Sequence, residues 1–382
     1  TERALAAIAT AVQLGRSATV VAITGSNGKT SVKALAQAIL ERAGRTYATP
    51  GNRNNEIGMP LAVIDAPDDA RFAVYEMGTG KPGDIAYLTA IARPDIGLVN
   101  NVAPAHIERM GSLLAIADTK AAVYDDLPGD GVAVINADDA FAPYFAERAH
   151  GRRLIRFGLD HGADVSARDV ALGEDGSRFV LVTPDGEAPV ALAMPGRHNV
   201  RNALAAAAIA LGAGVGLDTI VAGLGAARPV AGRLVTHVLP GGARLIDDSY
   251  NANPGSLAAA IDTLAESSRG AGDAAWLVLG DMRELGADGA AMHAEVGRRA
   301  KAAGIARLFT LGPLSASATQ AFGDGAAHFE SHEALADALR MAIAQGGGAL
   351  RVLVKGSRGS AMDRIVTALL PDGAAQGGHH AA

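Results

Sequence analysis

The sequence predicts an α/β protein with a mostly parallel sheet, followed by a second, smaller α/β domain. Two observations predict this class. Short apolar, β-branched runs alternate with helical stretches from the start of the chain, as in parallel strands that are joined by helical crossovers. The alternation stops after Gly158 and resumes beyond a Gly/Ala/Pro stretch at 223–230, which we interpret as a domain boundary.

The composition excludes several classes of protein. The chain has 382 residues, enough for two or three domains. With 49% hydrophobic and 19% charged residues, it is not a disordered chain, and its net charge of −6 argues against nucleic acid as a partner. It contains no cysteine, so disulfides and thiolate chemistry are excluded. No apolar run reaches the ~20 residues of a membrane span, and no signal segment is apparent. We therefore expect a cytoplasmic globular protein.

The individual elements follow from hydrophobic periodicity. In the first region, strands are predicted at 18–23, 72–75, 96–99, 132–135 and 153–157, and a helix at 29–43 with Gly44 as its C-cap. Runs at 177–183 and 188–193 predict a small antiparallel addition, and 199–213 is an Ala/Leu-rich helix. The second region has predicted strands at 244–246, 275–279, 307–310 and 350–354, and predicted helices at 256–265, 289–303, 332–344 and 362–369. This second pattern is Rossmann-like.

The most informative segment is a loop that joins the first strand to the first helix. It contains Gly25, Ser26, Asn27, Gly28, Lys29 and Thr30. Backbone N–H groups of such a turn and of the helix start bind phosphates. Lys29 would reach the β- and γ-phosphate oxygens of ATP, and the Thr30 hydroxyl would ligate Mg²⁺. The usual spacing places a glycine five residues before Gly28, where this chain has Ile23, so a chance Gly-Lys-Thr at a helix start is the alternative.

Further segments carry a family resemblance. Thr24–Thr30 resembles the ATP loop of the Mur ligases, and other matches extend from about residue 18 to 366. They lie at Pro50–Pro60, Glu76–Ile85, Asn100–His106, Pro195–Asn202, Asp247–Pro254, Leu279–Gly286 and Lys355–Arg358. The first of these resembles the members that use D-Ala-D-Ala.

The resemblance implies a domain layout. We expect a remnant of a linker or helix at 1–16, a central P-loop ATPase domain at 17–227, a C-terminal domain at 228–371 and a flexible tail at 372–382. The family also has a UDP-binding domain before the ATPase. Because the phosphate loop begins at Thr24, we expect that domain to be missing here. A monomer is favoured.

The resemblance also implies an activity: ADP-forming synthesis of an amide bond between UDP-N-acetylmuramoyl-tripeptide and D-Ala-D-Ala, through an acyl phosphate, for peptidoglycan precursors. ATP and Mg²⁺ are the implied cofactors, since Mg²⁺ and cationic side chains screen the charge in phosphoryl transfer. Two alternatives stay open: a truncated ATP-binding module that is inactive without a UDP-binding domain, and a related Mur or folylpolyglutamate-type ligase. A generic P-loop NTPase would need switch elements, and we see none.

Catalytic and metal-binding roles are implied for four positions besides Lys29. Glu76 follows a predicted strand, where carboxylates point into the ligand crevice of α/β sheets, and it is assigned to Mg²⁺ with Thr30. His106 matches a metal-ligating histidine, although imidazole is unusual for a hard cation. Lys120 aligns with a lysine that is carbamylated in the family. A solvated strand-end Glu76 and an exposed helical Lys120 are the plain alternatives.

Nucleotide and substrate contacts are implied for the remaining positions. The ATP-binding set is completed by His198, Asn199, Asn202, Arg233 and Asp248. Asparagine can pair with an adenine edge, but it also caps helices. The substrate-binding set is Asn52, Asn54, Asn55, Tyr250, Asn251, Asn253, Asp281, Glu284, Lys355 and Arg358. Arginine suits a terminal carboxylate. Many of these residue types also form turns without any ligand.

Overall fold

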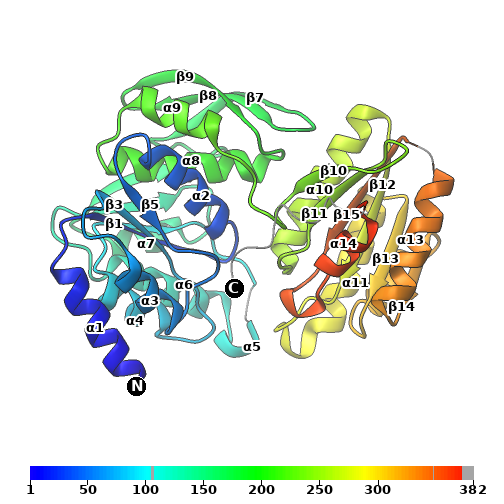
Figure 1. Ribbon diagram of the computed structural model, residues 1–382, viewed down its shortest axis with the longest axis horizontal. Coiled ribbons are helices and arrows are strands. Elements are labelled where there is room, and N and C mark those ends of the chain that lie inside the picture. The colour runs from blue at the N-terminus through cyan, green and yellow to red at the C-terminus, as the bar shows by residue number, and fades with distance from the viewer. Residues whose placement is uncertain (105–106, 347, 372–382) are drawn as a thin grey trace. The chain divides into compact units, whose positions relative to one another are not determined.

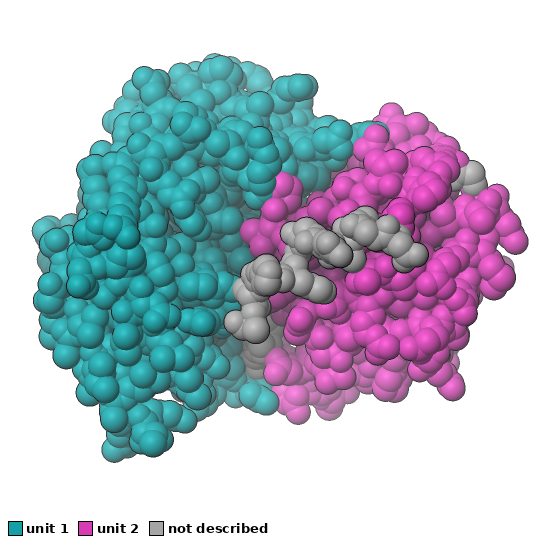
Figure 2. Space-filling view, in the orientation of Figure 1, with its two compact units in different colours: residues 1–103, 109–228, 381–382 teal, residues 104–108, 229–380 magenta. Residues whose placement is uncertain are grey.

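The computed structural model describes residues 1–104, 107–346 and 348–371. The chain forms two compact units (Figure 2). Unit 1 runs to Arg228, apart from a short segment around Glu108 that belongs to unit 2. Unit 2 begins at Pro229.

Unit 1 is built on a six-stranded parallel sheet of order β2-β3-β1-β4-β5-β6 (Figure 1). The strands are β1 Thr19–Thr24, β2 Thr46–Ala48, β3 Phe72–Glu76, β4 Ile96–Val99, β5 Val132–Asn136 and β6 Arg153–Phe157. Successive side chains of β1 point to opposite faces, and both faces are buried. Val21 and Ile23 join one apolar cluster, whereas Val20 and Ala22 join the other. This two-sided burial explains why the strands read as continuous apolar runs.

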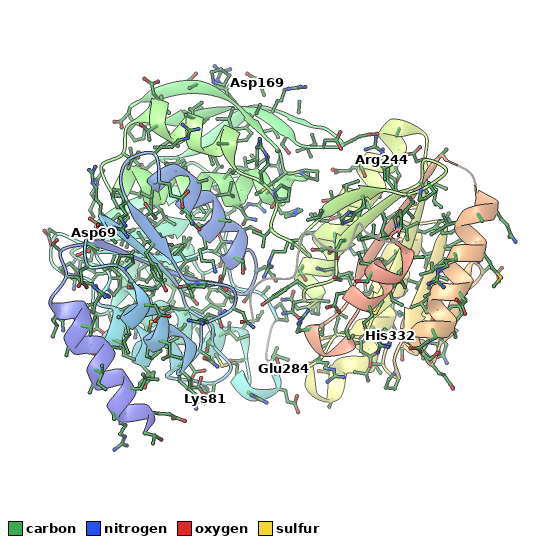
Figure 3. The ribbon with its side chains drawn as sticks, viewed as in Figure 1. Asp69, Lys81, Asp169, Arg244, Glu284 and His332 are labelled. Atoms are coloured by element: carbon green, nitrogen blue, oxygen red, sulfur yellow. The ribbon has the colours of Figure 1, made fainter. Side chains whose placement is uncertain are left out.

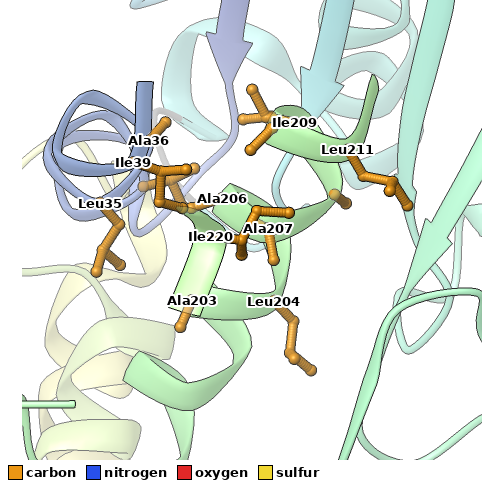
Figure 4. Packing of buried hydrophobic residues seen from close by; sticks show 14 of the residues in the cluster. Leu35, Ala36, Ile39, Ala203, Leu204, Ala206, Ala207, Ile209, Leu211 and Ile220 are labelled. Carbon is orange, nitrogen blue, oxygen red and sulfur yellow. The ribbon is translucent and has the colours of Figure 1, made fainter. Parts of the chain in front are cut away.

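Helices cover both faces of this sheet. They are α1 Glu2–Leu14, α2 Lys29–Leu40, α3 Gly58–Asp65, α4 Asp84–Ala92, α6 Leu113–Ala121, α7 Ala142–Arg148, α8 Arg197–Gly212 and α9 Leu217–Ala226, with a 3₁₀ turn at Ala122–Tyr124. The short helix α5 Ile107–Met110 begins in the segment that belongs to unit 2. On one face, Leu35 and Ile39 of α2 belong to the same cluster as Ala206 of α8 and Ile220 of α9 (Figure 4). The many alanines of α8 allow this close packing of helices.

A three-stranded antiparallel sheet continues the same apolar cluster. Its strands are β7 Ser166–Leu172, β8 Ser177–Thr183 and β9 Gly186–Leu192. Phe179, Leu181 and Val190 point into the cluster that contains α8. The antiparallel addition predicted from the sequence is therefore present, with β7 as a third strand.

Unit 2 is a second α/β sheet, of order β10-β11-β15-β12-β13-β14, in which only the β10–β11 pair is antiparallel. Its strands are β10 Val235–Val238, β11 Arg244–Asp248, β12 Ala274–Gly280, β13 Arg307–Leu311, β14 Ala326–Phe329 and β15 Leu350–Lys355. Its helices are α10 Pro254–Ala271, α11 Gly289–Ala302, α12 Ala316–Phe322, α13 His332–Gly346 and α14 Asp363–Leu369, with 3₁₀ turns at Gly286–Asp288 and Arg358–Ser360. Residues of α10, α11 and α12 cover one face, and residues of α13 and α14 cover the other.

The predicted fold class is confirmed, while one local expectation is wrong. Helix α2 ends at Leu40 with Glu41 as its C-cap, so Gly44 does not cap it. Within the Gly/Ala/Pro stretch at 223–230, Gly223 and Gly225 belong to α9, and the boundary between the two units falls between Arg228 and Pro229. Gly223 is needed for packing, because an added Cβ would lie 2.5 Å from the Cα of Ile39. Among the described helices, none has the length and apolarity to span a membrane.

Candidate active site

The phosphate loop lies between β1 and α2, as the sequence predicts. Gly28 is the N-cap of α2 with φ 79°, a left-handed conformation that glycine adopts easily. The Lys29 Nζ donates to the Gly25 carbonyl at 2.8 Å, which folds the side chain back over the loop. The turn and the start of α2 together form a phosphate-binding geometry.

Asparagine side chains from two other elements hold this loop. Asn100 Nδ2, just after β4, donates to the Asn27 carbonyl at 2.9 Å and to Asn202 Oδ1 of α8 at 3.2 Å. Asn101 accepts from the Asn27 N–H at 2.8 Å. A Cβ on Gly28 would lie 2.5 Å from Asn202 Oδ1 and 2.6 Å from Asn100 Nδ2. Asn202 therefore helps to brace the loop, and Asn100 and Asn101 are additional candidate residues of the site.

Glu76 is buried at the carboxyl end of β3, with 3% of its side chain exposed, rather than solvated. The Thr30 hydroxyl lies 3.3 Å from Glu76 Oε1. Two neighbouring oxygen ligands of an octahedral Mg²⁺ at ~2.1 Å lie about 3 Å apart. The two predicted ligands thus lie close enough to each other to share one magnesium ion. No three His, Asp or Glu side chains of the described residues form a metal cluster, in keeping with a cation that phosphate oxygens also ligate.

Lys33 is a further site residue that the sequence analysis did not identify. It lies one helical turn after Lys29, and its ammonium is 3.1 Å from Glu76 Oε2. Only 7% of its side chain is exposed. The signal in the sequence was the four-residue spacing, which puts Lys29 and Lys33 on one face of α2.

Lys120 lies in α6 and is buried, with 3% of its surface exposed, so the exposed-lysine alternative is wrong. Burial, and to a smaller extent the positive charge of Lys29, hold the pKa of Lys120 well below its ordinary value. No described carboxylate forms an ion pair with it. A lowered pKa makes the amine of a lysine easier to deprotonate to its nucleophilic form. His106 lies outside the described residues.

The first turns of α8 carry the other nucleotide-binding candidates of unit 1. Asn199 donates to the Pro195 carbonyl at 2.8 Å and accepts from Asn202 Nδ2 at 3.2 Å. Both asparagines are buried, whereas His198 is half-buried. The two asparagines are fixed by the fold, which leaves His198 as the more accessible candidate.

The predicted substrate loop follows β2. Asn54 Nδ2 donates to Glu76 Oε1 at 2.9 Å, so this side chain braces the carboxylate. Asn55 Oδ1 accepts from the Gly58 N–H at 2.8 Å at the start of α3, which is a turn role. Asn52 is exposed.

Unit 2 holds the remaining candidates, and one group gathers around an aromatic ring. The guanidinium of Arg233 lies 4.5 Å from the ring centroid of Tyr250, and that of Arg358 lies 5.8 Å from it. Arginine stacks favourably on an aromatic face. The arrangement places two cations near one ring, and guanidinium groups suit phosphate or carboxylate ligands.

A second group in unit 2 is held by internal contacts. Lys355 Nζ pairs with Asp248 at 2.6 Å and donates to the Asn251 carbonyl at 2.9 Å. Asn253 caps α10, since its Oδ1 accepts from the Ser256 N–H at 2.9 Å. Lys355, at 4% exposed, therefore orders this loop more than it offers a free charge to a ligand.

The third group lies after β12. Asp281 accepts from the N–H of Ser315 at 2.8 Å, and Glu284 (labelled in Figure 3) has φ 62°. The Met282 N–H donates to Nε2 of the buried His293 at 2.9 Å. His293 Nδ1 must then carry the proton that it shares with the Gly289 carbonyl at 2.6 Å. These contacts fix the backbone between Asp281 and Glu284.

A phosphate loop facing a buried acid and a buried lysine, followed by a second α/β unit, defines a class of ATP-using ligases. Models of the Mur ligase middle domain and of the Mur ligase glutamate ligase domain match residues 23–210 and 232–358. The chain belongs to the Mur ligase family, which confirms the resemblance in the motifs.

Comparisons with individual proteins indicate which members of the family this chain is similar to. The UDP-N-acetylmuramoyl-tripeptide–D-alanyl-D-alanine ligase of Escherichia coli K12 is 42% identical over 93% of this chain and 78% of its own length. MurF from Acinetobacter baumannii has a TM-score of 0.91 and 31% identity over 97% of this chain and 80% of its own. MurF from Thermotoga maritima, solved with ADP, has a TM-score of 0.86 and 26% identity over 96% and 83% of the two chains.

Proposed function

We propose that this chain joins D-Ala-D-Ala to UDP-N-acetylmuramoyl-tripeptide in an ATP-dependent, ADP-forming reaction of peptidoglycan precursor synthesis. The observation that carries the proposal is the 3.3 Å approach of Thr30 and Glu76 beside a loop shaped for phosphate. The relatives, which are ligases of this specificity, support the choice of substrates.

The reaction has two steps. The tripeptide carboxylate attacks the γ-phosphorus, which forms an acyl phosphate and expels ADP. The dipeptide amine then attacks the acyl carbon, forms the amide and expels inorganic phosphate, with loss of a proton. The loop N–H groups and Lys29 would hold the β- and γ-phosphates in line for the first step. Mg²⁺, held by Thr30 and Glu76, would supply charge neutralisation on the phosphates.

Lys120 supports a further part of the proposal. An uncharged Lys120 amine can add to carbon dioxide, forming a carbamate and releasing a proton. The carbamate would place a negative charge where the Lys29 charge now repels a lysine ammonium. It would also supply oxygen, the ligand type that Mg²⁺ prefers. His106 would complete this ligand set.

Unit 2 would bind the second substrate. The paired cations Arg233 and Arg358 around Tyr250 suit the ATP phosphates and the dipeptide carboxylate respectively. Asp281 and Glu284 would face the dipeptide amine. Asp248, Asn251 and Asn253 would shape the loop that carries Tyr250.

An isotope experiment tests the acyl phosphate. The UDP-linked tripeptide is prepared with heavy oxygen in its terminal carboxylate and incubated with the chain, MgATP and D-Ala-D-Ala. We expect one heavy oxygen in the released phosphate, because that oxygen bridges carbon and phosphorus in the intermediate. Phosphate without label would mean that water attacks ATP directly, and the proposed chemistry would then be wrong.

A further inference from the structure

Lys33 is held inside unit 1 by two hydrogen bonds and an ion pair. Its ammonium donates to the Thr49 carbonyl at 2.8 Å and to the Gly51 carbonyl at 3.0 Å, and it forms an ion pair with Glu76 Oε2 at 3.1 Å. Its positive charge therefore has three oxygen neighbours. A buried charge satisfied in this way is expensive to disturb, which indicates a specific role.

The three oxygens belong to two parts of the site. Thr49 and Gly51 begin the loop that runs to Asn55, which we call the substrate loop, and Glu76 is the proposed metal ligand. The loop has a second link to the same carboxylate through Asn54 Nδ2, at 2.9 Å from Oε1. The backbone beyond the strand joins in, because the Gly78 N–H donates to the Asn54 carbonyl at 2.7 Å. The carboxylate and the loop are therefore held as one assembly.

Lys33 and Asn54 contact different oxygens of the Glu76 carboxylate. Lys33 forms its ion pair with Oε2, while Oε1 accepts from Thr30 and from Asn54. A rotation of the carboxylate would separate Oε1 from Thr30 and would also pull on the loop at Gly51. Any displacement of the loop would in turn misplace the metal ligand.

We propose that Lys33 is a positioning residue that couples binding of the tripeptide substrate at the Thr49–Asn55 loop to binding of Mg²⁺ at Glu76. This rests on the proposed function for the identity of the substrate. The coupling is reciprocal, as any equilibrium coupling between two ligands must be.

Lys33→Met tests the coupling, with Gln37→Met as the matched control. Gln37 lies one turn further along α2, where its amide bonds to exposed Glu41. In Lys33→Met we expect the KM for the UDP-linked tripeptide and the Mg²⁺ concentration for half-maximal rate each to rise roughly 10–100-fold. ATP affinity measured in EDTA should stay within about twofold of the control. Lys33→Arg, which keeps the charge and several donors, should recover part of the loss.

The sign of the change in Mg²⁺ affinity in Lys33→Met distinguishes a positioning role of Lys33 from a purely electrostatic one. Removing a cation beside Glu76 would by charge alone tighten Mg²⁺ binding. Tighter Mg²⁺ binding, or an equal loss of affinity for ATP and tripeptide, would overturn the proposal.

Hydrogen exchange provides a readout without activity. In the ligand-free protein, amides of residues 51–55 should exchange at least tenfold faster in Lys33→Met than in Gln37→Met, and unchanged exchange in a folded variant would overturn the proposal. If Lys33→Met does not fold, Asn54→Ala cuts the second link and should raise the same two constants, and unchanged constants would overturn the proposal. If the unaltered chain forms no amide product, the proposed function fails, while the exchange comparison still decides the role of Lys33.

Discussion

Two buried titratable side chains, Lys120 and His293, illustrate what single residues contribute. Burial lowers the pKa of both side chains, which favours the uncharged form of each. Lys120 has no described carboxylate beside it, whereas His293 is fixed by two backbone groups. Lys120 is therefore a candidate for a chemical role, whereas His293 has a structural role.

For Lys120 we expect the ligase rate to depend on dissolved carbon dioxide. Buffer stripped of bicarbonate should lower the rate of the unaltered chain, and added bicarbonate should restore it. Lys120→Arg should lose roughly 100-fold or more in kcat, because a guanidinium stays charged and cannot form the carbamate. Full activity in stripped buffer, or in Lys120→Arg, would exclude carbamylation as a requirement.

For His293 the lowered pKa predicts a loss of stability in acid. Below the ordinary pKa of about 6.5, the unfolded chain binds a proton that the folded chain does not, so the stabilisation present at neutral pH falls as the pH falls. The loss from this residue reaches up to about 1.4 kcal/mol per pH unit.

Fluorescence of Trp276 measures this effect, since it is the single tryptophan and lies in β12 of unit 2. Urea unfolding is compared near pH 7.5 and near pH 5.5. The unaltered chain should lose more stability on acidification than His293→Gln, which keeps an acceptor for Met282 but does not titrate. An equal loss in both would contradict the assignment.

Among the elements, the start of α2 provides a comparison with a built-in control. Gly28 and Gly83 are both N-caps in the left-handed conformation, with φ 79° and 88°. Alanine at either position should destabilise the fold by about 1–2 kcal/mol. Only at Gly28 does the new Cβ meet Asn100 and Asn202, because Gly83 has nothing within 4 Å.

Gly28→Ala should therefore lose ATP affinity by roughly tenfold or more, whereas Gly83→Ala should retain it. Calorimetric titration with ATP measures the difference at a temperature where both variants are folded. Equal affinities would mean that the asparagine bracing does not shape the phosphate loop.

Burial determines which elements could be predicted from the sequence. Strands β4 and β6, buried on one or both faces, were predicted at their observed bounds, and β1 within one residue. Strands β2 and β10 were missed, because three or four half-exposed residues leave no apolar period. Gly44 misled the prediction because the helix ends before it.

The backbone of the candidate site was predictable where a motif fixes it, as in the loop Gly25–Thr30 between β1 and α2 and at Glu76, which ends β3. Side chains that act by long-range contact were not. Lys33 resembles any polar residue of an amphipathic helix, and its partners come from 16 residues and more away along the chain. The hydrogen bond between Asn54 and Glu76 could not be predicted for the same reason, because the two residues lie far apart along the chain.

For the whole molecule, the candidate residues divide between the two units. Unit 1 carries the phosphate loop, the proposed metal ligands Thr30, Glu76 and Lys120 and the substrate loop, while unit 2 carries the residues proposed for the dipeptide. This division predicts that both units take part in one reaction with three substrates.

The most direct test is to incubate the purified chain with MgATP, UDP-N-acetylmuramoyl-tripeptide and D-Ala-D-Ala and to identify the products by mass spectrometry. We predict a UDP-linked pentapeptide with one ADP formed per amide bond. ATP binding without any pentapeptide, or ADP formation that ignores D-Ala-D-Ala, would contradict the proposed ligase activity.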